Sequence, residues 1–176
     1  MYGLTIAIGI ITSIFLAENL TKKRGLNSQI FWELSFWVIL FGVVGARIYH
    51  VVDLWNLYSQ APLSIFFIWN GGVGIFGAIM AGILTAAILL KAKKQNVPEW
   101  LDIFSVVAPL GQAIGRWGNY FNNELIPFAI YESIADLVLF GLVFLIYSRR
   151  PKAGIVTAVY LIGYAAIRIL LQPFRL

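Results

Sequence analysis

The 176-residue chain contains no cysteine and only one histidine, His50. Without cysteine, the protein has no disulfides, no thiolate metal sites and no cysteine nucleophile of its own. A single histidine is also too few for a multi-histidine metal site. We therefore expect neither a metal nor a cofactor.

Charged residues are scarce as well. Only 12% of the chain is charged, 60% is hydrophobic, and the mean hydropathy is +0.84. A soluble domain carries roughly twice that charged fraction, and several apolar stretches here reach the length of about 18 residues that crosses a bilayer. Residues 1–20 lack a basic leader and a small-residue cleavage site, so they indicate a first spanning helix. The composition predicts an integral membrane protein with one transmembrane domain over residues 1–176.

Hydrophobic runs separated by polar loops predict an all-α, polytopic membrane bundle of about six helices. The expected spans are residues 2–20, 30–52, 70–91, 100–121, 127–148 and 154–173.

The net charge of +5 is concentrated in alternate loops, so nucleic acid is not an expected partner. The loops between these carry no Lys or Arg. Cytoplasmic loops are enriched in Lys and Arg, which predicts that the basic loops are cytoplasmic and that both termini are extracytoplasmic. The basic residues are Lys22, Lys23 and Arg24 in the first such loop, Lys91, Lys93 and Lys94 in the second, and Arg149, Arg150 and Lys152 in the third.

Arg47, Arg116 and Arg168 lie near the ends of the three helices that run outward in this topology. At about 1.5 Å per residue, they share one depth below the outer surface. A lone arginine there could reach the interface along its own side chain. Three at one level favour an anion-binding cleft that opens to the outer leaflet, with a structural salt-bridge network as the alternative. Acidic residues occur at a similar level: Glu124, Glu132 and Asp136.

A glycine-rich segment, residues 69–78, begins the third expected helix. Glycines allow close packing of membrane helices, which is one interpretation. The other is that Gly71 and Gly72, which follow Asn70, expose backbone N–H groups at a helix N-terminus. Such groups favour a phosphate.

A second segment, residues 115–124, is the strongest local signal. Arg116, Asn119 and Asn122 recur at intervals of three on one helix face, and Gly115 and Gly118 leave the surroundings open. A guanidinium flanked by carboxamides suits a phosphate and glycerol hydroxyls.

The segment Gly115-Arg116-x-Gly118-Asn119-Tyr120-x-Asn122-x-Glu124 resembles the signature of the prolipoprotein diacylglyceryl transferase family. Similar matches extend over nearly the whole chain. They are Tyr2-Gly3-Leu4, Gly45-Ala46-Arg47-Ile48, Trp69-Asn70-Gly71-Gly72, Tyr131-Glu132, Gly163-Tyr164-x-x-x-Arg168 and Phe174-Arg175.

The resemblance implies a bacterial enzyme of the cytoplasmic membrane with its site toward the outer leaflet. Phosphatidylglycerol would donate its sn-1,2-diacylglyceryl group to the lipobox cysteine of a prolipoprotein, with release of glycerol 1-phosphate. By this resemblance, Arg116 and Arg168 would be the essential arginines, and the supporting site residues would be Tyr2, Gly71, Asn119, Glu124 and Tyr164. From the positions described above, we also expect Arg47, Gly72 and Asn122 to bind substrate. Glu124 flanks the signature and faces outward, so it is the expected base.

The chain departs from the family pattern in three respects. Phe76 stands where a histidine is usual, so His50 is an alternative base. The extramembrane head region is nearly absent, because Pro127 follows Glu124 almost at once. A seventh helix is not found after Arg175, so we expect a minimal form of the family.

Two further functions remain as alternatives. A small anion transporter would need polar residues through the inner halves of the helices, and those halves are almost purely apolar. A catalytically silent relative that binds lipid is consistent with the missing head region and with Phe76.

Overall fold

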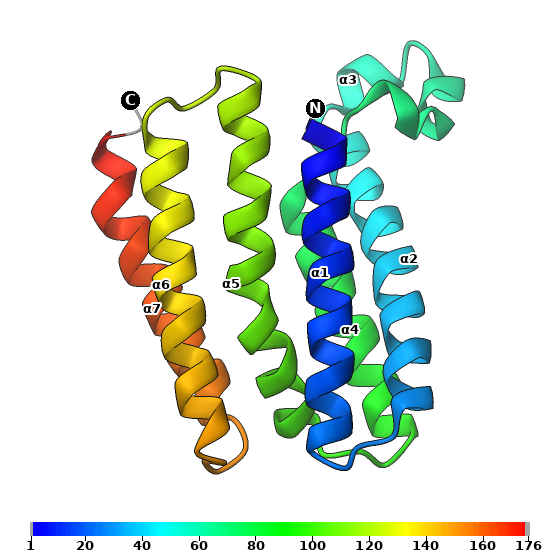
Figure 1. Cartoon of the computed structure of the whole chain (residues 1–176). Coiled ribbons are helices and arrows are strands. Elements are labelled where there is room, and N and C mark those ends of the chain that lie inside the picture. The colour runs from blue at the N-terminus through cyan, green and yellow to red at the C-terminus, as the bar shows by residue number, and fades with distance from the viewer. Residues whose placement is uncertain (1, 175–176) are drawn as a thin grey trace. The chain divides into compact units, whose positions relative to one another are not determined.

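The computed structural model describes residues 2–174, which form helices and connecting loops without strands (Figure 1). The chain falls into two compact units. The first contains the residues up to Asn27 and those from Pro98 onward, and the second contains Ser28–Val97. The expectation that they form one transmembrane domain stays a prediction.

The first unit consists of four long helices and a terminal turn. They are α1 (Tyr2–Lys23), α5 (Val97–Phe121), α6 (Phe128–Ser148), α7 (Ile155–Leu171) and the 3₁₀ turn η3 (Gln172–Phe174). Small residues join α1 to α5: a Cβ on Gly9 would lie 3.1 Å from the carbonyl oxygen of Gly111, and the Ser13 hydroxyl donates to the carbonyl of Val107 at 3.4 Å. Close approach through glycine and serine is typical of membrane helices, which gain little from hydrophobic burial in lipid.

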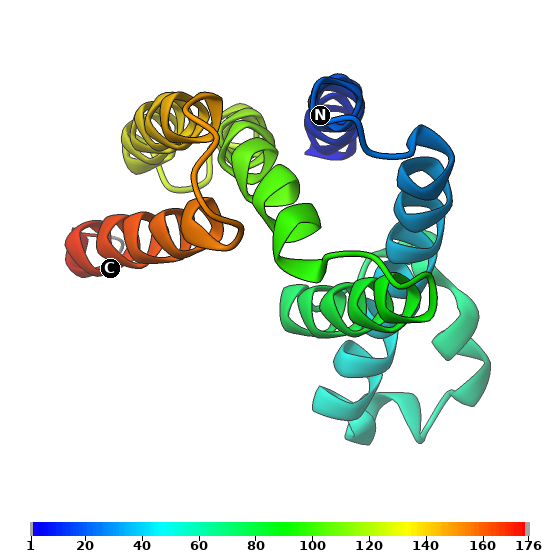
Figure 2. The same cartoon turned by 90° about the horizontal axis from the view of Figure 1, so that it is seen from below.

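Polar contacts fix α5, α6 and α7 to one another. The Ser133 hydroxyl of α6 donates to the carbonyl of Ala113 in α5 at 2.9 Å. At the other end of α5, the buried carboxylate of Asp102 accepts the backbone N–H groups of Gly154 and Thr157, both at 2.8 Å. Asp102 therefore caps the N-terminus of α7 from a neighbouring helix. α6 and α7 lie side by side in both views (Figures 1 and 2).

The second unit is an antiparallel pair, α2 (Ser28–Asp53) and α4 (Ile75–Ala92), with three short helices between them in sequence. These are α3 (Trp55–Tyr58), η1 (Pro62–Phe66) and η2 (Ile68–Asn70), which lie beyond the C-terminal end of α2 in Figure 1. Gly45 and Gly77 face each other so closely that a Cβ on either would collide with the carbonyl oxygen of the other. The packing interpretation of the glycines is thus confirmed for Gly77.

The all-helical prediction is confirmed, and five of the six expected helices lie within a few residues of their observed bounds. The third was wrong at its start: α4 begins at Ile75, not at residue 70. Gly71 and Gly72 have positive φ angles of 86° and 78°, a conformation that a right-handed helix cannot include.

Four of the described helices are long and apolar enough to cross a membrane: α1, α2, α4 and α6. α7 is apolar but shorter, with 17 residues. α5 carries Asp102 and Arg116, which bind partners within their own unit. Charged groups in membrane helices are usually turned inward in this way. Spanning by α5 and α7, and the placement of the termini, stay predictions.

Candidate active site

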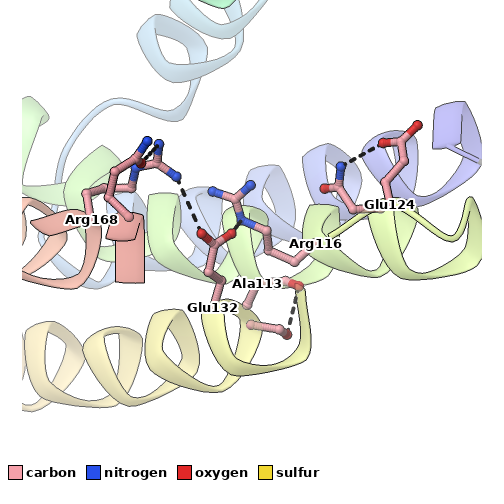
Figure 3. Close-up of polar contacts among 8 residues, drawn as sticks. Ala113, Arg116, Glu124, Glu132 and Arg168 are labelled. Carbon is pink, nitrogen blue, oxygen red and sulfur yellow. Dashed lines mark hydrogen bonds and ion pairs between the residues drawn. The ribbon is translucent and has the colours of Figure 1, made fainter. Parts of the chain in front are cut away.

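Glu132 of α6 binds two arginines from two other helices. The Nε atom of Arg116, on α5, lies 2.9 Å from Glu132 Oε2. The Nη1 atom of Arg168, on α7, lies 3.4 Å from Glu132 Oε1. The Glu132 side chain is only 2% exposed, whereas those of Arg116 and Arg168 are 19% and 32% exposed. One buried carboxylate therefore orients two partly accessible guanidinium groups (Figure 3).

The antiparallel course of α6 explains why these residues meet. Arg116 and Arg168 lie near the C-terminal ends of α5 and α7, and Glu132 lies near the N-terminal end of α6. The sequence predicted one level for the two arginines, and the structure brings them together. The sequence analysis did not include Glu132 among the expected site residues. An acidic residue within an apolar helix was nevertheless a usable signal.

The bonding of each guanidinium determines which donors remain. Arg116 uses Nε toward Glu132, and its terminal nitrogens turn away from that carboxylate in Figure 3. Arg168 uses Nη1 toward Glu132 and donates from Nη2 to Gln172 Oε1 at 2.9 Å. Asp136 is a second carboxylate that interacts electrostatically with both guanidinium groups, so the suitability of the cluster for an anion depends on its donors and not on its net charge. Arg116 retains an edge with two nitrogens that suits a phosphate.

Glu124 lies apart from this cluster in Figure 3 and is exposed. Its Oε2 atom accepts a hydrogen bond from Asn119 Nδ2 at 3.0 Å. Asn122 lies in the turn after α5. The expectation that Arg116, Asn119 and Asn122 share one continuous helix face was therefore wrong. Open surroundings were predicted for Gly115 and Gly118. They are confirmed for Gly115, where a Cβ would meet nothing within 4 Å, but Gly118 is buried in α5, so the prediction was wrong there.

Other expected residues lie on the same unit. Tyr164 is one turn before Arg168 on α7 and stacks on Tyr160 with ring centroids 6.0 Å apart. Tyr2 is the first residue of α1, and its side chain lies outside the described part of the chain. Asp136, one turn after Glu132, is buried, and neither of its carboxylate oxygens has a hydrogen-bond partner within residues 2–174.

Arg47 belongs to the second unit and is bound by backbone. It is 8% exposed and donates to four carbonyl groups, those of Ser64, Ile65, Gly71 and Gly72, at 2.5–2.8 Å. Its guanidinium also lies 5.1 Å from the ring centroid of Tyr58. These bonds join the end of α2 to the segment that leads to α4. A role for Arg47 toward lipid phosphate stays a prediction.

The helix-terminus geometry expected at Gly71 and Gly72 was wrong. Both residues precede α4, and their carbonyl groups accept bonds from Arg47. A Cβ on Gly72 would lie 2.6 Å from the His50 ring. His50 lines a cavity of about 280 Å³ together with Arg47, Tyr58 and Gly72. Phe76, at the expected histidine position, is 64% exposed, with its ring centroid 6.1 Å from that of Tyr49.

The whole chain matches one protein family, prolipoprotein diacylglyceryl transferase, over residues 1–127 and 125–176. The chain belongs to this family. It is 36% identical to a relative from Symbiobacterium thermophilum over 203 residues, which cover 99% of this chain and 76% of the relative. Relatives from Synechocystis sp. and Finegoldia magna are 36% and 33% identical, again over 99% of this chain, and are covered over 74% and 78% of their lengths. All three are named phosphatidylglycerol–prolipoprotein diacylglyceryl transferase.

The family match also bears on the region between α5 and α6. It divides at residues 125–127, which is where the sequence indicated a nearly absent head region. The 203-residue alignment is longer than the 176-residue chain, so the relative contains residues within the aligned stretch that this chain lacks. In this chain, α5 and α6 are joined only by residues 122–127.

Replacement of Arg47 with glutamine should destabilise the second unit. Hydrogen bonds from a charged donor contribute about 1.5–3 kcal/mol each, and a glutamine cannot reach all four carbonyls. We expect a loss of at least about 3 kcal/mol in the free energy of unfolding, measured by denaturant titration of the purified protein in detergent. Arg149→Gln, in an exposed loop, is the control. Wild-type stability in Arg47→Gln would contradict a structural role.

A double-mutant cycle should reveal coupling between Arg116 and Glu132. Glu132→Gln leaves two partly buried cations without their counter-ion, whereas Arg116→Gln leaves one anion still bound to Arg168. The double variant should therefore be more stable than the sum of the single effects by about 1–3 kcal/mol. Additive changes in the free energy of unfolding would show that the ion pair does not join α5 to α6.

Proposed function

We propose that this protein transfers the sn-1,2-diacylglyceryl group of phosphatidylglycerol to the lipobox cysteine of prolipoproteins and releases glycerol 1-phosphate. Family membership supports the reaction class. The single structural observation that carries the proposal is the pair of guanidinium groups held by Glu132. The protein would act in a bacterial cytoplasmic membrane, with this cluster toward the outer leaflet.

The arginines would act on the leaving phosphate. In the transfer, the cysteine sulfur forms a bond to the diacylglyceryl carbon, the C–O bond to phosphate breaks, and the electron pair leaves with the phosphate oxygen. Negative charge accumulates there as glycerol 1-phosphate departs. A donor that is held in place before reaction and aimed at developing charge contributes about 3–4 kcal/mol. The free edge of Arg116 suits this task, and Glu132 keeps the guanidinium from rotating away.

The substrate thiol must also lose its proton. A free cysteine has a pKa of about 8.5, and a guanidinium group next to the bound thiol would favour the thiolate. The Glu124 carboxylate is exposed, so it is accessible to an incoming peptide. Asn119 fixes one of its oxygens and leaves the other as the proton acceptor. Tyr164, on the same face of α7 as Arg168, would border the bound lipid.

Arg116→Ala should reduce diacylglyceryl transfer by 10²–10³-fold, the range typical for loss of one oriented donor. The measurement is the gain in mass of a lipobox peptide incubated with phosphatidylglycerol and the purified protein. Lys152→Ala removes a cation from an exposed loop and should leave the rate unchanged. Membrane insertion should be equal in both variants.

The same assay, together with measurements of lipid binding and of anion flux, distinguishes the alternative functions. A wild-type protein that binds phosphatidylglycerol without modifying the peptide would be a silent lipid-binding relative. A protein that instead moves anions across proteoliposomes would be a transporter. Near-normal transfer by Arg116→Ala would contradict the phosphate role.

Glu124→Gln should lower the rate far more than His50→Gln, because a glutamine accepts no proton. General-base catalysis typically contributes 10²–10⁴-fold. Measured across pH, the residual rate of Glu124→Gln should rise as the free thiol ionises in solution. If His50→Gln were the inactive variant and Glu124→Gln retained full activity, His50 would be the base instead.

A further inference from the structure

A basic cavity lies at the end of the first unit opposite the cluster of Arg116, Glu132 and Arg168. Its volume is about 200 Å³, and its lining includes three cations: Lys23 and Arg24 from the end of α1, and Arg150 after the end of α6. Tyr147 forms another part of the lining. Tyr147 follows Glu132 by 15 positions along α6, which corresponds to about 22 Å at 1.5 Å per residue. The cavity is therefore distinct from the candidate active site.

Arg24 is held in place at this cavity. Its Nη2 atom donates to the carbonyl oxygen of Tyr147 at 2.9 Å, and its guanidinium lies 4.2 Å from the centroid of the Tyr147 ring. Tyr147 itself is only 5% exposed. The cation is thus positioned by a buried neighbour before any ligand arrives, which reduces the entropy lost on binding.

Arg150 occupies a backbone position where glycine would be preferred. Its φ angle is +53°, and its N–H donates to the carbonyl of Tyr147 at 3.0 Å, which closes the end of α6. A left-handed residue at this place is usually glycine, because other residues are strained there.

Within the described chain, neither Lys23, Arg24 nor Arg150 has a carboxylate at salt-bridge distance, whereas the neighbouring Lys22 binds Glu18 at 2.9 Å. Three positively charged residues around one small cavity repel one another and favour an anion beside them.

We propose that this cavity binds the phosphodiester of an anionic phospholipid at the leaflet opposite the candidate active site. A lipid fits better than a soluble phosphate because the cavity is lined by apolar side chains as well as cations. Leu20 of α1 and Phe144 of α6 belong to the lining and would contact the lipid next to its phosphodiester. Two of the three basic loops from which the topology is predicted would thereby also form a lipid site.

Native mass spectrometry of the full-length protein in detergent tests this proposal. The probes are dioleoyl phosphatidylglycerol, dioleoyl phosphatidylcholine and inorganic phosphate. Wild-type protein should bind the anionic lipid at this site in preference to the zwitterionic one. The double variant R24Q/R150Q should lose one phosphatidylglycerol adduct, with affinity weakened roughly tenfold or more for two cations.

Matched variants separate this site from diffuse charge and from the substrate site. K22Q/K152Q also removes two cations at the same end, but neither residue lines the cavity, so it should keep the adduct. R150G relieves the left-handed strain and should remain folded while binding less lipid. R116A should retain this adduct even if it loses one at the other end.

Three results would overturn the proposal. The first is an equal number of adducts in R24Q/R150Q and wild type. The second is an equal loss in K22Q/K152Q, which would indicate charge without a site. The third is displacement of the lipid by millimolar inorganic phosphate, which would indicate a site for a free anion.

Discussion

The packing of α5, α6 and α7 in the first unit depends on how positive charge is stabilised inside an apolar helical protein. A guanidinium removed from water costs several kcal/mol unless a counter-ion and hydrogen bonds replace the water. Glu132 provides this for two arginines at once, at 2.9 Å and 3.4 Å. Glu132 binds Arg116 through Nε alone, which leaves the terminal nitrogens of that guanidinium outside the ion pair. An ion cluster that joins α5, α6 and α7 can therefore also present donors to an anion, so the structural and the ligand-binding interpretations of these arginines are compatible.

Arg47 is an arginine that is bound by backbone carbonyl groups and not by a carboxylate. Its donors are bound by the carbonyls of the segment before α4, which replace both counter-ion and water. A guanidinium in that state has little capacity left for a ligand, whereas Arg116, held through Nε alone, keeps its terminal edge. The difference arises from what surrounds each arginine, since all three lie in similar sequence positions near helix ends.

The two ends of the first unit use cations differently. At one end, Arg116 and Arg168 share a buried carboxylate. At the other, Lys23, Arg24 and Arg150 surround a cavity without an acidic partner in the described chain. The buried Glu132 carboxylate fixes the orientation of the two guanidinium groups, and a catalytic group must be held in a fixed orientation. Cations that lack a carboxylate partner instead favour binding of a lipid headgroup through its charge, for which a fixed orientation matters less. The connection between α5 and α6 at the first of these ends is short, because only residues 122–127 join the two helices.

Composition and hydrophobic periodicity alone determined the helical class and most helix bounds, because an apolar environment permits few ways to satisfy backbone polar groups. The spacing of Arg116 and Arg168 from their helix ends also determined that they share a level. Only the tertiary structure decided three features. They are the conformation of Gly71 and Gly72, the binding of Arg47 by four carbonyl groups, and the position of Glu132 between two arginines. Each depends on a carbonyl or carboxylate that a distant segment provides. A one-dimensional pattern gives the depth of a residue along a helix but not which way its hydrogen bonds point.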